Sequence, residues 1–317
     1  MFLVASAVAA MMIAASPVQE TADIEAAGVN GPLKGTLAGG GKPDAPVMLI
    51  IPGSGPTDRD GNNPLGVKAS TYRLLAEGLA ERGVTTVRID KRGMFASAGA
   101  APDANAVTID DYAHDTHAWV DAIRRRTEAP CVWLLGHSEG GLVALAAAQK
   151  GEHVCGLVLV ATAGRPLGEV LKRQLRANPA NAPLLGPADA AIDVLAAGQR
   201  VDASTLPLPL RPLFQPAVQG FLISAFALDP PKLMAQVRKP VLIVQGERDI
   251  QVGVDDARIL KSAAPRSTLV LLPDVNHVLK AVTSDDRGAN VATYADPNLP
   301  LATGVAEAIA DFVKLGR

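Results

Sequence analysis

Short, nearly uninterrupted apolar runs alternate along the chain with longer segments whose apolar residues recur at helical spacing. Such runs are typical of strands buried on both faces of a parallel sheet. Strands are predicted at residues 47–51, 84–89, 132–135, 157–160, 241–244 and 268–272. Helices are predicted from Ser70 to residue 82, from Thr108 or Asp110 to about 126, at 141–148, at 255–264, and up to about 314. The alternation predicts an α/β fold, with a mostly parallel central sheet, right-handed crossovers and flanking helices.

The segment before the first of these strands has a different pattern. Residues 21–37 predict a β-hairpin, because two strand-like stretches flank Asn30 and Gly31. These two residue types tolerate the positive φ that a tight hairpin turn requires. We therefore expect Asn30-Gly31 to form the turn.

The alternation stops between residues 163 and 239, where several helical patterns are interrupted by prolines and no strand-like run occurs. This predicts a helical cap inserted into the domain at about residues 163–239. Its last helix, at about 217–226, carries an apolar stripe that includes Phe221, Leu222 and Phe226. A stripe of this kind predicts packing against a neighbouring helix. In a cap it can also line a substrate pocket, so these three residues are pocket candidates.

The first residues form an apolar stretch of their own. Residues 1–15 are apolar or small and are too few to span a bilayer comfortably. They resemble the core of a secretory signal, so we predict a signal peptide at residues 1–20 and a periplasmic or secreted domain at 21–317. No Lys or Arg precedes the run and Pro17 follows its end, which leaves an uncleaved anchor or a mis-assigned start as the alternatives. No other stretch is apolar enough to cross a membrane.

Charge excludes some partners. The formal net charge is −2, which gives no electrostatic basis for binding nucleic acid or an anionic membrane. Aromatic residues make up 3% of the chain, so the core must consist mainly of Ala, Val and Leu. The composition leaves the oligomeric state open.

The pentapeptide from Gly136 to Gly140, with Ser138 at its centre, follows a predicted strand and precedes a predicted helix. This context is typical of a nucleophile elbow, in which a strained turn exposes the serine hydroxyl above the sheet. A Cβ atom at Gly136 or Gly140 would collide with the neighbouring strand and helix. A helix beginning at Glu139 would also direct free backbone N–H groups at a developing oxyanion. Ser138 is the candidate nucleophile.

A serine nucleophile needs a general base and an acid that orients it. Of the 5 histidines, His277 follows a predicted strand in a loop at the carboxyl end of the sheet. His114 and His117 share one helix with three aspartates, which is more typical of a solvated helix face than of a metal site. Asp249, after the strand at 241–244, is the candidate acid, with Glu247 as the alternative. The order serine, acid, histidine is that of α/β-hydrolases.

From residue 21 onward the chain resembles an α/β-hydrolase of the bacterial carboxylesterase group, which includes the EstD-like esterases and the serine aminopeptidase-like hydrolases. The most specific matches are Gly-Ser-Gly-Pro-Thr-Asp-Arg-Asp-Gly at 53–61, the elbow at 136–141, and a tail with Asn290 and Tyr294. The stretch 88–93 also resembles the family, but Phe95 replaces its next glycine. Phe95 could reshape the pocket wall or fill a gap.

The resemblance implies an oxyanion hole formed by the N–H groups of Ser54, or alternatively Gly53, and Glu139. It also implies acyl transfer by Ser138, His277 and Asp249 with no metal or organic cofactor. The unlike charges of Asp58, Arg59 and Asp60 predict an ion-pair network that holds this loop, with substrate positioning as the alternative.

Three substrate classes fit such a site, and we expect short-chain carboxylic esters, which are small molecules. An aminopeptidase would need carboxylates in the cap to hold an α-amine, whereas residues 163–239 contain more basic than acidic residues. A thioesterase would use the same site. A non-catalytic binding protein on this fold is the alternative of a different class.

The chain has 2 cysteines, Cys131 and Cys155, each at the start of a predicted strand. If these strands are parallel neighbours, the two Cα atoms could lie within the roughly 4.4–6.8 Å that a disulfide needs. Two buried thiols that behave as small apolar residues are the alternative. Both cysteines are expected at the amino ends of the strands, away from the active site.

Overall fold

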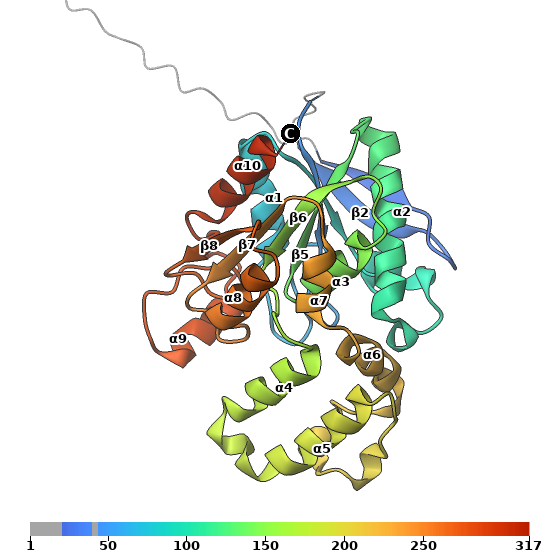
Figure 1. Cartoon of the computed structure of the whole chain (residues 1–317), viewed down its shortest axis with the longest axis vertical. Coiled ribbons are helices and arrows are strands. Elements are labelled where there is room, and N and C mark those ends of the chain that lie inside the picture. Colours follow the sequence, from blue (N-terminus) through green and yellow to red (C-terminus); the bar gives the residue numbers. More distant parts are fainter. Residues whose placement is uncertain (1–20, 40–43, 317) are drawn as a thin grey trace, which may run out of the picture.

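The computed structural model describes residues 21–39 and 44–316, so the predicted signal peptide at 1–20 lies outside the described residues. A single eight-stranded sheet, in the order β1-β2-β4-β3-β5-β6-β7-β8, forms the centre of the molecule (Figure 1). β1 and β2 pair antiparallel with each other, β2 pairs antiparallel with β4, and the remaining strands are parallel. The predicted α/β fold is confirmed. The strands are Thr21–Ala26, Leu33–Ala38, Val47–Ile51, Thr85–Ile89, Val132–His137, Val154–Val160, Val241–Gly246 and Thr268–Leu272.

The predicted hairpin is present, but its turn is not the one that we expected. β1 and β2 pair with Ala26 opposite Leu33, and residues 27–32 connect them. Neither Asn30 nor Gly31 adopts a positive φ. The prediction of a tight Asn-Gly turn is therefore wrong, because a longer loop makes the connection without left-handed residues.

Helices cover both faces of the sheet. β3 shows why its sequence is apolar at every position: Leu49 and Ile51 pack on one face, and Met48 and Ile50 pack on the other. Successive strand residues point to opposite faces, so a strand covered on both sides has no position left for a polar side chain. α2 (Ile109–Thr127), α3 (Glu139–Ala148) and α8 (Val254–Ala263) cover the first face. α1 (Thr71–Glu81) and α10 (Val305–Leu315) cover the second.

The two predicted helix starts differ in how they are capped. The Thr108 hydroxyl accepts a hydrogen bond from the Asp111 N–H, and the Thr108 N–H donates to the Asp111 carboxylate, which together form a capping box for α2. Ser70 precedes α1 as expected, but its side chain makes no capping hydrogen bond and its φ is 48°. Instead, the Ser70 N–H donates to Asn62 Oδ1 at 3.0 Å, which attaches the start of α1 to the loop after β3.

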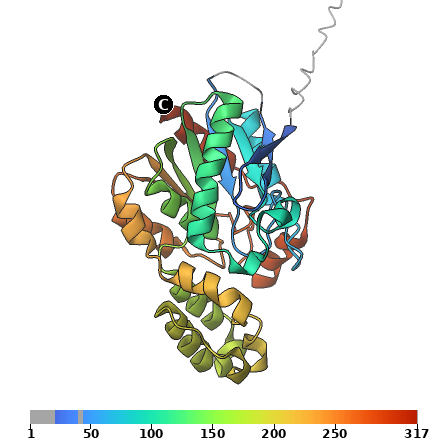
Figure 2. The same ribbon diagram turned by 90° about the vertical axis from the view of Figure 1, so that its right-hand side faces the viewer.

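The structure describes the whole segment between β6 and β7, which is helical and contains no strand. α4 (Leu167–Arg176), α5 (Leu185–Ala196) and α6 (Pro216–Phe226) form a group below the carboxyl ends of the strands (Figure 1). Figure 2 shows that this group projects from the body of the molecule. α7 (Pro230–Gln236) then returns to pack against α3 and α8. The sequence did not predict α7 or the short α9 (Arg287–Ala292) as separate helices. Within the described ranges, no helix is long and apolar enough to span a bilayer.

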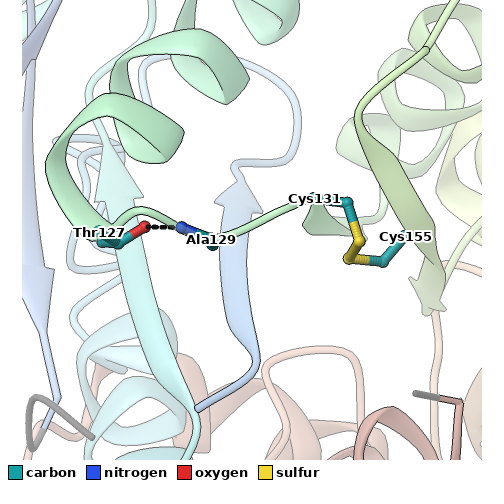
Figure 3. Close-up of a disulfide and its surroundings, with 4 residues drawn as sticks. All are labelled: Thr127, Ala129, Cys131 and Cys155. Carbon is teal, nitrogen blue, oxygen red and sulfur yellow. Dashed lines mark hydrogen bonds between the residues drawn. A yellow bond between two sulfur atoms is a disulfide. The ribbon is translucent and has the colours of Figure 1, made fainter. Parts of the chain in front are cut away.

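A disulfide joins the two cysteines at the amino ends of β5 and β6 (Figure 3). Their Cα atoms lie 5.2 Å apart, because β5 and β6 are parallel neighbours in the sheet. The geometry predicted for the pair is confirmed, and the alternative of two free thiols is wrong.

Candidate active site

Ser138 lies at the turn between β5 and α3 in a strained backbone conformation. Its φ is 55° and its ψ is −122°, a combination that costs on the order of 1–3 kcal/mol for a residue with a side chain. The turn is tight enough to require its glycines. A Cβ on Gly136 would lie 2.2 Å from the Gly140 carbonyl oxygen, and one on Gly140 would lie 2.3 Å from the Ile51 carbonyl oxygen. The local sequence thus fixes where the Ser138 side chain emerges from the sheet.

His277 and Asp249 meet across two different loops. The ring nitrogen Nδ1 of His277 lies 2.8 Å from Asp249 Oδ2, and both side chains are almost fully buried. Since a carboxylate only accepts, Nδ1 carries the proton and Nε2 is the ring nitrogen left for other contacts. Glu247, the alternative acid, is exposed, and no described contact joins its side chain to His277.

The Asp249 carboxylate is held by its own loop as well as by His277. Its Oδ1 accepts hydrogen bonds from the N–H groups of Gln251 at 2.7 Å and Val252 at 2.9 Å. Its Oδ2 also accepts from the Gln245 side-chain amide at 3.3 Å. These donors fix the orientation in which Asp249 faces the imidazole.

Ser138 and His277 line the same cavity, which has a volume of about 190 Å³. Its walls come from the loop after β3, the start of α1, and the loops that follow β7 and β8. No Asp, Glu, Lys or Arg side chain is among the described residues of this wall. The lining residues are Gly53, Ser54, Thr57, Gly61, Asn63, Val67, Thr71, Tyr72, His137, Ser138, Gln251, His277, Val278 and Tyr294.

The backbone N–H groups of Ser54, in the loop after β3, and of Glu139, the first residue of α3, have no acceptor in the described part of the chain. Ser54 lines the cavity, and Glu139 directly follows the cavity-lining Ser138. The Gly53 N–H is different, because it donates to the Tyr72 hydroxyl at 2.8 Å. Of the two predicted alternatives in this loop, Gly53 is therefore occupied and Ser54 is free. The N-terminus of α3 adds a partial positive charge at the same place.

Tyr72 and His137 form a bridge that the sequence did not predict. His137 Nε2 donates to the His277 carbonyl oxygen at 2.8 Å, so His137 Nδ1 must accept from the Tyr72 hydroxyl, 3.0 Å away. Burial lowers the pKa of His137 to about 3, which keeps this imidazole neutral. The bridge joins the Gly53 backbone to the His277 backbone. The only sequence signal for this bridge is the position of His137 inside the elbow.

A second unpredicted network joins the loops of Asp249 and His277. The Asn276 side-chain amide donates to Asn290 Oδ1 at 3.1 Å and to the Thr293 hydroxyl at 2.7 Å. The Asn290 amide in turn donates to the Arg248 carbonyl oxygen at 2.7 Å. The residues just before His277 and just before Asp249 are thereby held by one buried cluster. The tail motif that contains Asn290 was the only sequence signal for it.

Two of the three charged residues in the loop after β3 form the predicted ion pairs, and the third is held by backbone groups. Arg59 donates to Asp90 Oδ2 from Nε at 2.9 Å and from Nη2 at 2.7 Å. Asp60 pairs with Arg88, and Asp58 accepts from two backbone N–H groups within its own loop. None of the three side chains lines the cavity, so the interpretation as a network that holds the loop is confirmed.

The four predicted pocket residues do not line this cavity. Phe95 is 43% exposed at the surface. Phe221 packs edge-on against Tyr112 with ring centroids 6.4 Å apart, while Leu222 and Phe226 pack within the core that α6 shares with its neighbours. The stripe of α6 therefore packs between helices, which is the first of the two roles predicted for it, and the assignment of the four residues to a substrate pocket stays a prediction. His117, from the helix with three aspartates, bonds to the Ala147 carbonyl oxygen at 2.8 Å.

The chain is similar to a known family and to several solved structures. The family model described as serine aminopeptidase S33 matches residues 65–281, which is more than half of the chain and includes Ser138, Asp249 and His277. The Pf2001 esterase of Pyrococcus furiosus is 15% identical, with a TM-score of 0.57, over 94% of this chain and 93% of that chain. Est1E of Butyrivibrio proteoclasticus is 17% identical, with a TM-score of 0.57, over 93% and 98%. A thermophilic esterase of Thermogutta terrifontis is 18% identical, with a TM-score of 0.56, over 94% and 99%. A comparison with curated proteins finds no match.

Proposed function

Because the chain belongs to the serine aminopeptidase S33 family of α/β-hydrolases, and is therefore a hydrolase, we propose that it cleaves short-chain carboxylic esters. Ser138 is the proposed nucleophile, His277 the general base and Asp249 the acid that orients it. The proposed oxyanion hole consists of the Ser54 and Glu139 N–H groups.

The proposed reaction has two halves. Ser138 Oγ attacks the ester carbonyl carbon while its proton passes to His277 Nε2, and Asp249 stabilises the imidazolium that forms. The negative charge on the carbonyl oxygen is stabilised by the two free N–H groups. His277 then protonates the leaving alcohol as the bond between carbon and oxygen breaks, which leaves an acyl-enzyme. A water molecule that gives its proton to His277 attacks the acyl group, and the acid departs as Ser138 takes its proton back.

One observation carries the choice of an ester. The cavity that holds Ser138 and His277 is small and has no acidic or basic side chain among its described lining residues. An aminopeptidase must pair the ammonium group of its substrate, because an unpaired charge is costly to remove from water. A neutral ester requires no such partner. The esterases with a similar fold are consistent with this choice.

We also propose that the protein works in the periplasm or is secreted. The support is the disulfide between Cys131 and Cys155, because such bonds persist mainly in oxidising compartments. The apolar residues 1–15 agree with export. Detection of the protein in periplasmic and culture fractions tests this proposal.

The proposed activity is tested with purified protein and a panel of p-nitrophenyl esters from acetate to decanoate. Aminoacyl p-nitroanilides and acyl thioesters of matched chain length complete the panel. We expect the highest kcat/KM on the short esters, loss of that activity in Ser138→Ala, and full activity in the control Ser262→Ala, an exposed serine on α8. A preference for the p-nitroanilides or the thioesters, or activity that survives Ser138→Ala, would overturn the proposal.

A further inference from the structure

A buried lysine contacts the loop that carries Ser54. Lys91 follows β4 and is 5% exposed, and its ammonium group donates to the Gly53 carbonyl oxygen at 2.7 Å. The same nitrogen lies 3.7 Å from Glu139 Oε1 and 5.3 Å from the centre of the Tyr112 ring. The proposed mechanism gives this side chain no role, although a buried charge is costly to maintain.

The contact of Lys91 with the Gly53 carbonyl determines the orientation of the Ser54 N–H. The Gly53 carbonyl and the Ser54 N–H belong to one peptide group, and in a trans peptide these two bonds point in opposite directions. A cation on the carbonyl side therefore leaves the N–H directed away from it. Hydrogen bonding at the carbonyl also polarises the peptide, which strengthens the N–H as a donor.

We propose that Lys91 is a positioning residue that orients and polarises the Ser54 N–H of the oxyanion hole. The inference rests on the proposed function, because it assigns Lys91 a task in stabilising the tetrahedral intermediate. Lys91 acts together with Tyr72, which accepts from the Gly53 N–H, so both backbone polar groups of Gly53 are held by buried side chains. The two peptide groups that flank the Gly53 Cα are thus both held, and the second of them carries the Ser54 N–H.

Lys91 also faces the side-chain carboxylate of the residue that supplies the second proposed donor. Glu139, which it faces, is the residue whose N–H begins α3 at the cavity. The shorter contact, however, is the one to the Gly53 carbonyl, at 2.7 Å against 3.7 Å. If Lys91 served only to neutralise the buried Glu139, the carbonyl contact would have no consequence for the rate. A role limited to neutralising Glu139 predicts a change in stability, whereas the positioning role also predicts a lower kcat and weaker binding of an oxyanion.

The test compares Lys91→Met with the wild-type enzyme and with Lys150→Met, an exposed lysine just after α3. Three quantities are measured on p-nitrophenyl acetate or butyrate: kcat, KM, and the Ki of a trifluoromethyl ketone. This inhibitor forms a hemiketal oxyanion with the nucleophile, so its Ki reports on the oxyanion hole. Removing one oxyanion donor costs roughly 10²–10³ in kcat, and here the donor is weakened rather than lost. We expect kcat to fall about 10–100-fold, Ki to rise by a similar factor, and KM to change less than about threefold.

Folding is checked for each variant by circular dichroism. If Lys91→Met does not fold, Lys91→Gln, which keeps a polar donor without the charge, is judged by the same three quantities. A folded variant whose kcat and Ki stay within about twofold of wild type overturns the inference, as does a rise in KM with kcat unchanged. Failure of the proposed function looks different, because the wild-type protein itself would then not cleave the esters.

Discussion

The carboxyl ends of β5 and β6 differ from their amino ends in how the chain is constrained. At the carboxyl ends, the chain turns through Ser138 with a φ of 55° and through Ala161 with a φ of 49°, and buried polar groups surround the turns. At the amino ends, a disulfide between Cys131 and Cys155 ties the same two strands together. One pair of strands therefore bears strain at one end and a covalent constraint at the other.

This contrast explains how a strained serine can be held in place. Strain at a site persists only where the surrounding structure determines it from several directions. Here the strands are fixed by the parallel ladder and the disulfide, and the loops are fixed by the Tyr72–His137 bridge and the Asn276–Asn290 cluster. We infer that changes at the amino end alter stability alone, whereas changes at the carboxyl end also alter the rate.

The largest expected effect is on kcat and comes from variants of the site at the carboxyl ends of the strands. His277→Ala should lower kcat by roughly 10⁴–10⁶-fold, because Ser138 and His277 act as a unit in the proposed mechanism. Asp249→Asn should cost somewhat less, since the base remains but its tautomer is no longer fixed. Steady-state kinetics of both variants measure the loss of kcat, and thermal unfolding measures any change in stability.

Glu247→Gln, which replaces an exposed carboxylate in the same loop, is the matched control and should keep wild-type activity. More than a tenth of wild-type activity in His277→Ala would show that the base is another residue.

A smaller effect concerns the cost of burying His137 at the carboxyl end. Burial lowers its pKa to about 3 in the folded protein, whereas the unfolded chain takes up this proton near pH 6.5. Unfolded molecules therefore bind more protons, and the free energy of unfolding falls as the pH drops from 6.5 towards 3. One pKa unit corresponds to about 1.4 kcal/mol, so the loss over this window is on the order of 3–5 kcal/mol.

Urea unfolding at several pH values measures this loss. His137→Gln should be less sensitive to pH between 6.5 and 3 than the wild type, because its side chain does not titrate. The exposed His114 provides the control, and His114→Gln should follow the wild-type curve. Parallel curves for the wild type and His137→Gln would contradict the account.

The smallest expected effect comes from removal of the disulfide at the amino ends of β5 and β6. The double variant Cys131→Ala/Cys155→Ala removes a crosslink between residues 24 positions apart, which should lower the free energy of unfolding by about 3 kcal/mol. The kcat should stay within about twofold, because the site lies at the other end of the strands. Urea unfolding and ester kinetics on the same samples separate the two quantities. A tenfold fall in kcat would mean that the two ends are coupled.

Much of the fold could be predicted because a strand that is buried on both faces has a recognisably apolar sequence. A strand covered on both faces, such as β3, must be apolar at each position, and this pattern marked the core strands of the sheet. The candidate residues Ser138, Asp249 and His277 follow such strands, and in an open α/β sheet these positions lie at one edge. The meeting of Asp249 and His277 was therefore foreseeable from the order of the elements.

The remainder depends on contacts that leave no periodic signal. Tyr72 looks like an ordinary apolar position of α1, and its bond to His137 arises only when α1 packs beside the elbow. The stripe that contains Phe221 would read the same whether it faced a cavity or another helix, and here it packs against Tyr112. Loop-to-loop contacts such as that of Asn290 with Arg248 depend on how two distant loops pack. Tertiary packing determined each of these outcomes.

The most direct test of the central claim is reaction of the folded protein with a fluorophosphonate, followed by intact-mass spectrometry and peptide mapping. The account predicts one adduct per chain, located on Ser138, because Ser138 is the only serine that shares the cavity with the Asp249-bound His277 and stands within a strained turn among the described residues. The adduct should be absent in Ser138→Ala and should form far more slowly in His277→Ala. A folded protein that leaves Ser138 unmodified, or that carries the adduct on another residue, would contradict the account.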